Sequence, residues 1–201
     1  MKEIAIIAFD DFTDIDLFLM WDILGRNQQD WRVRILGVTP TIRSTHGLTI
    51  TVNGAVKDAN TADAVLFSSG KIGVPNILTN PNFLPELHLD PKHQYIGSIC
   101  AGAFILDELG LLPERKATTH QDAREGLISR KITPIDQPLV CHGKIATAGG
   151  CLSSVYLVGW LIESLFGKQK RKETLSHVLP AGQQLEFEDL IQSTLNQSEM
   201  S

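Results

Sequence analysis

Short apolar segments typical of buried strands alternate with segments of helical periodicity along this chain. The predicted strands are residues 3–9, 31–38, 64–68, 95–100, 139–141 and 144–147. The predicted helices are residues 14–26, 101–109, 123–129 and 152–166, where apolar side chains recur at the spacing of one helix face. Such alternation favours a mostly parallel sheet with helices on both faces. The sequence therefore predicts an α/β fold built as a three-layer sandwich.

Two segments depart from this alternation. Residues 41–53, broken by His46 and Gly47, predict a pair of short extended segments around a turn. A region rich in proline and asparagine follows the third strand, and it contains two short predicted helices near residues 75–78 and 83–87. An antiparallel flap is expected at residues 41–53.

The tail after Phe166 is the last predicted element. It predicts one amphipathic helix, followed by a frayed polar end at residues 197–201. No flexible linker divides the chain, and its hydrophobic content of 43% is sufficient for one full core. Residues 1–201 are therefore expected to form a single domain.

The acidic balance of the chain bears on its partners. A net charge of -5 opposes binding to polyanions, which needs clustered Lys and Arg that outweigh the carboxylates. The basic cluster formed by Lys168, Lys170, Arg171 and Lys172 is typical of a solvated helix face. No nucleic-acid partner is therefore expected.

Residues 145–162 carry no charge and approach the length of a membrane span. Gly149 and Gly150 interrupt the segment, and Glu163 follows it directly, so a strand leading into a buried helix fits better. The amino terminus also lacks the basic region and long apolar stretch of a signal peptide. The prediction is a cytoplasmic protein with no membrane partner.

The cysteines and histidines do not form a recognisable ligand motif. Cys100, Cys141 and Cys151 lack both the number needed for a secreted disulfide framework and the paired spacing of a zinc ribbon. The histidines at 46, 88, 93, 142 and 177 show no ligand pair on one helix face. Neither a metal nor a cofactor is expected.

The junction at Cys100 has a small residue two positions before it and two positions after it, namely Ser98 and Gly102. A sharp turn from strand to helix admits only small side chains at these positions and projects the central side chain into a cleft. The helix amino terminus would favour a thiolate there and lower the pKa of Cys100. The residues alone equally allow a small buried cysteine that only packs.

The motif Ser98-Ile99-Cys100-Ala101-Gly102, followed by Ala117-Thr118-Thr119-His120, resembles the signature of the ThiJ/PfpI superfamily. The interval between the cysteine and the histidine also matches, and the resemblance covers about residues 2–175. It implies a flavodoxin-like fold related to class I glutamine amidotransferases, with Cys100 on a nucleophile elbow. Members of the family are commonly dimers, so a homodimer is expected.

The resemblance also implies a set of residues around the thiol. An acidic residue from the first helix lies beside the cysteine in this family, and Asp16 stands at the matching position. Two adjacent anions are unfavourable, so Asp16 and Cys100 are predicted to share a proton and to titrate together. Taken alone, Asp16 is better explained as one of the acidic residues that are common at helix starts, and the family resemblance is what favours the role beside the thiol.

Gly70 matches the second glycine of a family turn whose backbone amide, with that of Ala101, would form an oxyanion hole. Ser69 replaces the first glycine of that turn. His120 matches a histidine near the thiol and could act as a general base or a polar contact, and a histidine satisfied within its own loop is the competing interpretation. Cys151 is expected to pack, although it could resolve an oxidised Cys100 if the two came within disulfide reach.

Departures from the family branches narrow the expected activity. The peptidase and glyoxalase branches usually carry histidine after the nucleophile, and the isonitrile hydratase branch carries threonine, whereas this chain has Ala101. In its pattern the chain stands nearest to the isonitrile hydratase branch and to the branch of the human parkinsonism-associated protein. The latter is a stress-response protein in this family.

The leading hypothesis is a cysteine-dependent hydrolase or lyase of a small molecule, with Cys100 as nucleophile and Asp16 as proton carrier. Isonitriles, glyoxals and amides are the candidate substrates. A non-enzymatic oxidative stress sensor based on Cys100 is one alternative. A ligand-binding regulatory domain is the other.

Overall fold

The computed structural model describes residues 1–198 of the chain. The strands are β1 (Lys2–Ile7), β2 (Trp31–Gly37), β3 (Thr41–Arg43), β4 (Thr49–Thr51), β5 (Gly54–Ala55), β6 (Ala64–Phe67), β7 (Tyr95–Ile99), β8 (Lys116–Ala117), β9 (Thr133–Pro134), β10 (Leu139–His142) and β11 (Ile145–Ala148). The α-helices are α1 (Asp14–Gly25), α2 (Gly73–Leu78), α3 (Ala103–Glu108), α4 (Arg124–Ser129), α5 (Ser154–Phe166), α6 (Lys168–Ser176) and α7 (Gln184–Ser198). Short 3-10 helices are η1 (Val56–Thr61), η2 (Leu84–Glu86), η3 (Cys100–Gly102), η4 (Pro113–Arg115), η5 (Gln121–Ala123) and η6 (Cys151–Ser153).

The main sheet has seven strands in the order β10-β11-β7-β6-β1-β2-β5. Its neighbouring strands are parallel except for β10, which pairs antiparallel with β11. The predicted pair of extended segments is present as β3 and β4, which pair antiparallel outside this sheet. The short predicted helices are present as α2 and η2.

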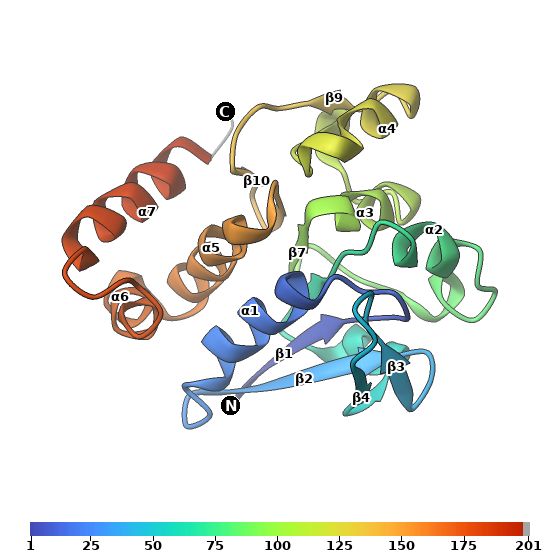
Figure 1. Cartoon of the computed structure of the whole chain (residues 1–201), viewed down its shortest axis with the longest axis horizontal. Helices are drawn as coiled ribbons and strands as arrows, with labels where there is room; N and C mark the ends of the chain where they lie inside the picture. Colours follow the sequence, from blue (N-terminus) through green and yellow to red (C-terminus); the bar gives the residue numbers. More distant parts are fainter. Residues whose placement is uncertain (199–201) are drawn as a thin grey trace.

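Helices cover both faces of the sheet, with α1 and α5 on one side and α2 and α3 on the other (Figure 1). Alternate side chains of β1 enter the two cores that result, because successive residues of a strand point to opposite faces. Ile4 and Ile6 pack with residues of α1 and α5, whereas Ala5 and Ile7 pack with residues of α3. Full burial of a side chain such as Ile4 stabilises the folded state by roughly 1.5–3 kcal/mol. The layers and the strand order confirm the predicted α/β fold with a mostly parallel central sheet.

The uncharged segment 145–162 divides between β11 and the 13-residue helix α5, as the sequence predicts. Gly150 has a φ of +85° at the turn between these elements, a conformation that favours glycine. Across residues 1–198, none of the helices combines the length and the apolar character that crossing a membrane requires. The apolar side chains of α5 instead pack in the hydrophobic core between α1, α5 and the sheet.

The prediction of a single helix in the carboxyl-terminal tail is wrong, because the tail forms two helices. α6 ends at Ser176 and α7 begins at Gln184, and the connection contains Pro180 and Gly182. Proline cannot continue a helix, and Gly182 has a φ of +80°, so the chain turns there. Gln197 and Ser198, predicted as frayed, belong to α7, and the rest of that predicted frayed end lies outside the described residues.

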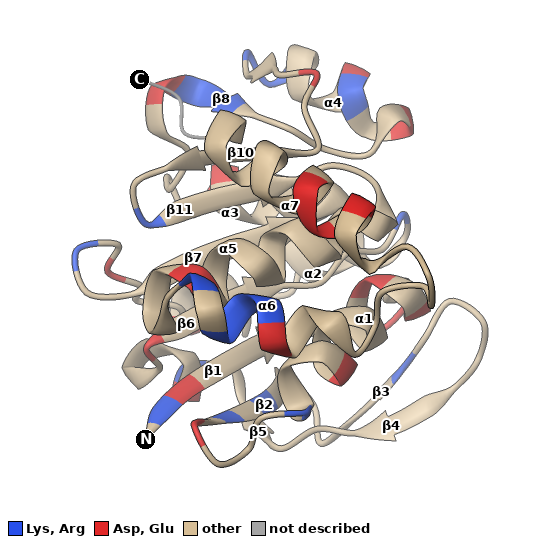
Figure 2. Ribbon diagram, turned by 90° about the vertical axis from the view of Figure 1, so that its left-hand side faces the viewer, with Lys and Arg blue, Asp and Glu red and all other residues tan. Residues whose placement is uncertain are grey.

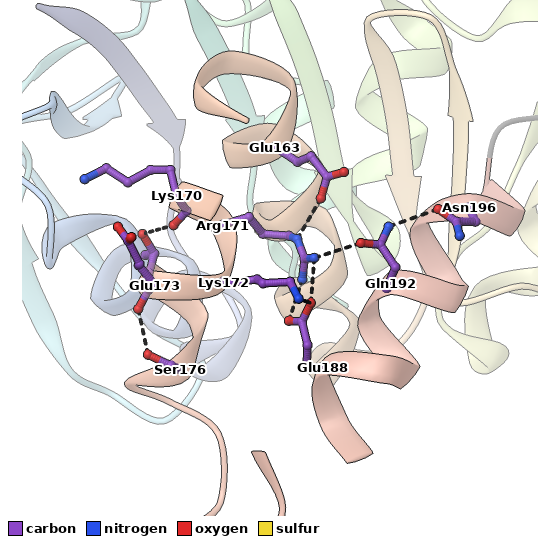
Figure 3. A network of polar contacts seen from close by, with 10 residues as sticks. Glu163, Lys170, Arg171, Lys172, Glu173, Ser176, Glu188, Gln192 and Asn196 are labelled. Carbon is purple, nitrogen blue, oxygen red and sulfur yellow. Dashed lines mark hydrogen bonds and ion pairs between the residues drawn. The ribbon is translucent and has the colours of Figure 1, made fainter. Parts of the chain in front are cut away.

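Arg171 corrects the interpretation of the basic cluster as a solvated helix face. Its side chain is 0% exposed. The Nε atom donates to Glu163 Oε2 at 2.7 Å, and the Nη1 and Nη2 atoms donate to the two carboxylate oxygens of Glu188 at 2.8 Å each. A further hydrogen bond of 3.1 Å joins Nη2 to Gln192 (Figure 3).

The Arg171 contacts connect three helices. Glu163 belongs to α5, Arg171 to α6 and Glu188 to α7, so one guanidinium group joins the tail to the core. Basic segments of α6 lie on the same side of the molecule as acidic segments of α7 (Figure 2). A bidentate pair of this kind fixes orientation as well as charge. Arg171, rather than the whole basic cluster, therefore holds the tail in place.

Candidate active site

Cys100 lies where β7 ends and η3 begins, at the carboxyl edge of the parallel sheet. Its φ is +49°, a left-handed conformation that is unfavourable for a residue with a Cβ atom. Strained backbone of this kind persists only where the surrounding structure enforces it. The turn has the form of the predicted nucleophile elbow, and it leaves the Cys100 side chain 3% exposed.

The small residue after the elbow is required by close packing. A Cβ atom at Gly102 would lie 2.8 Å from the carbonyl oxygen of Ser68, a backbone atom at the end of the neighbouring strand β6. The two segments can approach this closely only because residue 102 has no side chain. Ser98, the small residue before the elbow, is fully buried in β7.

The Thr-Thr-His segment of the sequence motif secures the elbow from the other side. Thr119 Oγ1 donates to the carbonyl oxygen of Cys100 at 2.8 Å. Thr118 is held in turn by its backbone amide, which donates to Thr147 Oγ1 at 3.0 Å, and by its own hydroxyl, which donates to Gln137 O at 2.7 Å. These contacts fix the strained cysteine against β11.

Asp16 lies beside the thiol, as the family resemblance implies. It is in the first turn of α1 and is 1% exposed. Cys100 Sγ donates to Asp16 Oδ1 at a distance of 3.7 Å, which is within the range of a sulfur hydrogen bond. The backbone amide of Thr13, just before α1, donates to Ser69 O at 2.7 Å and so fixes the start of this helix at the site.

Cys151 completes a cluster with these two residues. It begins η6, and its Sγ, the Cys100 Sγ and an Asp16 carboxylate oxygen all lie within 4.8 Å of one another. Cys151 is less buried than Cys100. No spacing in the sequence predicts the approach of Cys151 to Asp16, because residues 16, 100 and 151 come together only through the packing of α1 against η6 and the elbow.

Burial opposes the ionisation of all three groups, and Asp16 further opposes the ionisation of both thiols. Burial raises the pKa of Asp16, although contacts with the Cys151 and Cys100 thiols act to lower it. Burial and the negative charge of Asp16 raise the pKa of Cys100 well above its ordinary value. Burial and the hydrogen bond to Asp16 raise the pKa of Cys151 to about 11. These directions agree with the predicted sharing of a proton between Asp16 and Cys100.

The prediction of a lowered pKa at Cys100 is therefore corrected. It relied on the positive end of a following helix, but the elbow continues into one 3-10 turn and the six-residue helix α3. So short a helix offers little dipole, and the thiol is both buried and next to a carboxylate. Burial and the adjacent carboxylate thus both favour the neutral form of the thiol.

Ser69 contacts two groups of the site, and the sequence analysis did not predict these contacts. The Ala101 backbone amide donates to Ser69 Oγ at 3.0 Å. The Ser69 hydroxyl also contacts the Asp16 carboxylate and acts to lower the pKa of that group. Ser69 thus connects one predicted oxyanion donor to the acid beside the nucleophile. The only signal in the sequence was that a hydroxyl residue replaced the first glycine of the turn.

Gly70 lies in the same turn, at a point of close approach. A Cβ atom there would be 2.2 Å from the carbonyl oxygen of Asp11, so the turn accepts no side chain at this position. The assignment of Gly70 and Ala101 as an oxyanion hole stays a prediction. A substrate oxygen would reach the Ala101 amide only after Ser69 Oγ had moved aside.

His120 lies on the rim of the site and is held by its own loop. Its Nδ1 atom accepts a hydrogen bond of 3.2 Å from the backbone amide of Asp122. In the neutral imidazole the proton is therefore on Nε2, which can donate but cannot accept. The positive form of His120 would act to lower the pKa of Asp16. This geometry favours a polar contact for His120 over a general base, and its role stays a prediction.

A cavity of about 380 Å³ opens over the cluster. The side chains of Asp16, Cys100 and Cys151 line it, together with Ser69 and His120. Most of its remaining wall is apolar and comes from Val74, Pro75, Ala101, Phe104 and Ala123, and Thr13, Lys71 and Asp122 complete the lining. A small molecule without charge would fit such a lining, with its reactive atom placed at Cys100.

The cluster also bears on metal binding, for which the sequence analysis expected no site. Within the described part of the chain, Asp16, Cys100 and Cys151 form the group of three whose donor atoms lie close enough to hold a metal ion. An ion would have to displace the protons of two thiols whose pKa values are raised. The resting arrangement therefore favours proton sharing.

Comparison with known proteins connects this site to a family. The model of the DJ-1/PfpI family matches residues 2–164. The chain is 24% identical over 168 residues to the isonitrile hydratase of Pseudomonas putida, an alignment that covers 82% of this chain and 72% of that protein. It is 25% identical over 187 residues to the protein DJ-1 homolog A of Arabidopsis thaliana, covering 89% of this chain and 47% of that longer protein.

Solved structures show the same fold. A ThiJ/PfpI family protein from Pseudomonas syringae superposes with a TM-score of 0.79 at 18% identity, covering 98% of this chain and 88% of that one. At this level of identity the likeness concerns the fold. It agrees with the parallel sheet and flanking helices described above.

Proposed function

Because the chain belongs to the DJ-1/PfpI family, we propose that it is a cysteine-dependent enzyme that acts on a small electrophilic molecule. Cys100 is the nucleophile, and Asp16 carries the proton. The observation that supports this most strongly is the strained elbow, which places the Cys100 Sγ 3.7 Å from Asp16 Oδ1 in a cavity of about 380 Å³. Hydration of an isonitrile is the reaction that the site supports best.

Asp16 acts first in the proposed reaction. Its raised pKa makes it a stronger base than an exposed carboxylate, and the thiol proton already points at its oxygen. Asp16 takes this proton while Cys100 Sγ forms a bond to the terminal carbon of the isonitrile. The same proton then passes to that carbon, which gives a thioimidate attached to Cys100.

Water completes the reaction. It adds to the thioimidate carbon, and the substrate nitrogen gains a proton, so a tetrahedral intermediate forms. The bond between carbon and sulfur then breaks, the Cys100 sulfur regains a proton, and an N-substituted formamide leaves. The backbone amides of Gly70 and Ala101 stabilise the negative charge that develops on the oxygen of this intermediate. The Ala101 amide becomes available for this once the Ser69 hydroxyl has moved away from it. The net change is the addition of one water molecule.

Three observations favour an isonitrile over the other candidate substrates. The relative from Pseudomonas putida is an isonitrile hydratase, and the apolar wall of the cavity suits the uncharged carbon skeleton of such a substrate. Ala101 stands where the glyoxalase branch carries histidine, which makes glyoxals less suitable. Ala101 lacks the hydroxyl of the threonine that the isonitrile hydratase branch carries at this position. A hydroxyl is instead present on Ser69, and it accepts a hydrogen bond from the backbone amide of Ala101.

A substrate panel tests the proposal. The purified chain is incubated under reducing conditions with a cycloalkyl isonitrile, with methylglyoxal and with a simple amide, and products are identified by NMR. We expect formamide from the isonitrile, and a loss of at least about 10²-fold in rate for Cys100→Ser, because a hydroxyl is a poor nucleophile here. Cys141→Ala is the matched control, since Cys141 lies in β10 outside the cluster.

The panel also has outcomes that oppose the proposal. Formamide production that survives in Cys100→Ser would remove Cys100 as the nucleophile. Turnover of none of these substrates by the wild-type chain would favour the ligand-binding or sensor alternatives. Conversion of methylglyoxal alone would keep the nucleophile and replace the substrate class.

A further inference from the structure

Cys151 is the one member of the cluster that the proposed reaction does not use. It follows Gly150 at the turn after β11 and faces the same cavity as Cys100. Its sulfur lies within 4.8 Å of the Cys100 sulfur, and Asp16 contacts both thiols. Two thiols that share a carboxylate beneath one cavity are placed for chemistry with each other.

We propose that Cys100 and Cys151 form a reversible disulfide when a hydroperoxide enters the cavity, with Cys151 oxidised first and Cys100 as the attacking thiol. This inference goes beyond the proposed hydration and does not depend on it. The oxidant is a hydroperoxide, and a dithiol reductant restores the two thiols.

The separation of the sulfurs is compatible with such a bond. A disulfide brings its sulfur atoms to about 2.05 Å, so the two side chains must move toward each other from their present separation to form it. Cys151 begins a 3-10 helix directly after a glycine with a φ of +85°, at a point where the chain reverses. Cys141, the third cysteine, does not belong to the cluster.

The order of oxidation follows from exposure and acidity. Cys151 is partly exposed, whereas Cys100 is 3% exposed, so an oxidant entering the cavity meets Cys151 first. The pKa of Cys151 is raised to about 11, and that of Cys100 is raised further. Cys151 therefore supplies more thiolate, which is the form that attacks peroxide.

The chemistry balances in two steps. Cys151 thiolate attacks one peroxide oxygen and breaks the O–O bond. This step gives a sulfenic acid on Cys151 and, after protonation, one water molecule from hydrogen peroxide or one alcohol molecule from an organic hydroperoxide. Asp16 then accepts the proton of Cys100, whose sulfur attacks the Cys151 sulfur and displaces hydroxide. Hydroxide takes that proton and leaves as water. Two thiols lose two electrons in total, and the peroxide gains them.

The disulfide would have a consequence for the proposed enzyme. While it exists, Cys100 cannot attack a substrate, and it is also protected from oxidation to sulfinic and sulfonic acids, which thiols do not reverse. Peroxide treatment should therefore stop turnover, and a dithiol should restore it. The disulfide is detected by mass spectrometry, so it can be tested even if the chain turns over no substrate.

Peptide mapping tests the proposal on the wild-type chain. Protein cleared of metal with a chelator is treated with one equivalent of hydrogen peroxide, then unfolded in urea, labelled with N-ethylmaleimide and analysed without reduction. We expect the loss of two hydrogens from the intact mass, label at Cys141 only, and a cross-linked pair of peptides containing Cys100 and Cys151. Dithiothreitol should return label to all three cysteines. Oxygen added to Cys100 while Cys151 keeps its thiol would overturn the proposal.

Two variants test the order of oxidation. In Cys100→Ser the sulfenic acid at Cys151 has no partner, so dimedone should capture it there. In Cys151→Ser the oxidation of Cys100 should slow by at least about 10-fold and proceed to sulfinic acid, because the more exposed thiol is gone. Cross-linking between Cys141 and either other cysteine, or equal disulfide yield in urea-unfolded protein, would show that the folded cluster is not responsible.

Discussion

At the scale of the residue, the site depends on a carboxylate that is costly to bury. Asp16 is 1% exposed, and its pKa is raised because burial disfavours the charged form. A carboxyl whose folded pKa exceeds its unfolded value of 3.8 loses stability as the pH rises between the two values. At neutral pH the charged Asp16 therefore reduces the free energy of unfolding, while it provides the base for Cys100.

Asp16→Asn should separate these two effects. The amide cannot accept the thiol proton as a base, so isonitrile turnover should fall by about 10²-fold or more. The same change removes the cost of a buried charge, and the free energy of unfolding at pH 7 should rise by about 1 kcal/mol. Steady-state rates and denaturant titrations measure the two quantities. A variant that is less stable and fully active would contradict this role for Asp16.

At the scale of the element, the elbow depends on the approach of η3 to the end of β6. Gly102→Ala would place a Cβ atom 2.8 Å from Ser68 O, so one of these segments must shift. We expect a loss of roughly 1–3 kcal/mol in the free energy of unfolding, together with reduced turnover as Cys100 moves. Chemical denaturation measures the first effect.

Gly25→Ala is the control for this prediction. Gly25 ends α1, and a Cβ atom there would have open space within 4 Å. Replacing this helical glycine by alanine should leave stability unchanged or raise it by up to about 1 kcal/mol. Equal losses from both substitutions would show that the effect at Gly102 is not specific to the elbow.

The elements of the fold and part of the site could be predicted from the sequence. Strand and helix periodicity is local, and so is the pattern of small residues around Cys100. The α/β order and the elbow are confirmed, whereas the single predicted tail helix is two helices. Contacts between distant segments were missed because no local pattern reports them: Cys151 beside Asp16, Ser69 on the Ala101 amide, and the pKa of Cys100 all depend on packing. Arg171 was missed because its charge suggested solvent, whereas two glutamates compensate it inside the protein.

At the scale of the whole molecule, the tail is held to the core through Arg171. Removing this guanidinium would leave Glu188, whose side chain is 16% exposed, without its bidentate partner. Arg171→Met should lower the free energy of unfolding by about 3 kcal/mol. Lys172→Ala is the control, because the Lys172 side chain is 42% exposed and its ion pair is screened by solvent. Thermal unfolding of the two variants checks the difference.

The Arg171 contacts also predict a dependence on pH. Burial acts to raise the pKa of Glu188, but the hydrogen bonds from Arg171 and Lys172 outweigh it and lower that pKa below its ordinary value of 4.5. This stabilisation is fully present above pH 4.5 and is lost as the pH falls through the folded pKa. The stability difference between wild type and Arg171→Met should shrink in that acidic range. A difference that stays constant there would contradict the role of the ion pair.

The central claim for the whole molecule is that its fold holds Cys100 as a neutral thiol that shares a proton with Asp16. The direct measurement is the rate of Cys100 alkylation across pH, followed by peptide mass in the wild-type chain and in Asp16→Asn. The account predicts a midpoint above the ordinary cysteine value of about 8.5 in the wild type, and a lower midpoint in Asp16→Asn, where the neighbouring charge is absent. A wild-type midpoint well below that value, or an upward shift in Asp16→Asn, would contradict it.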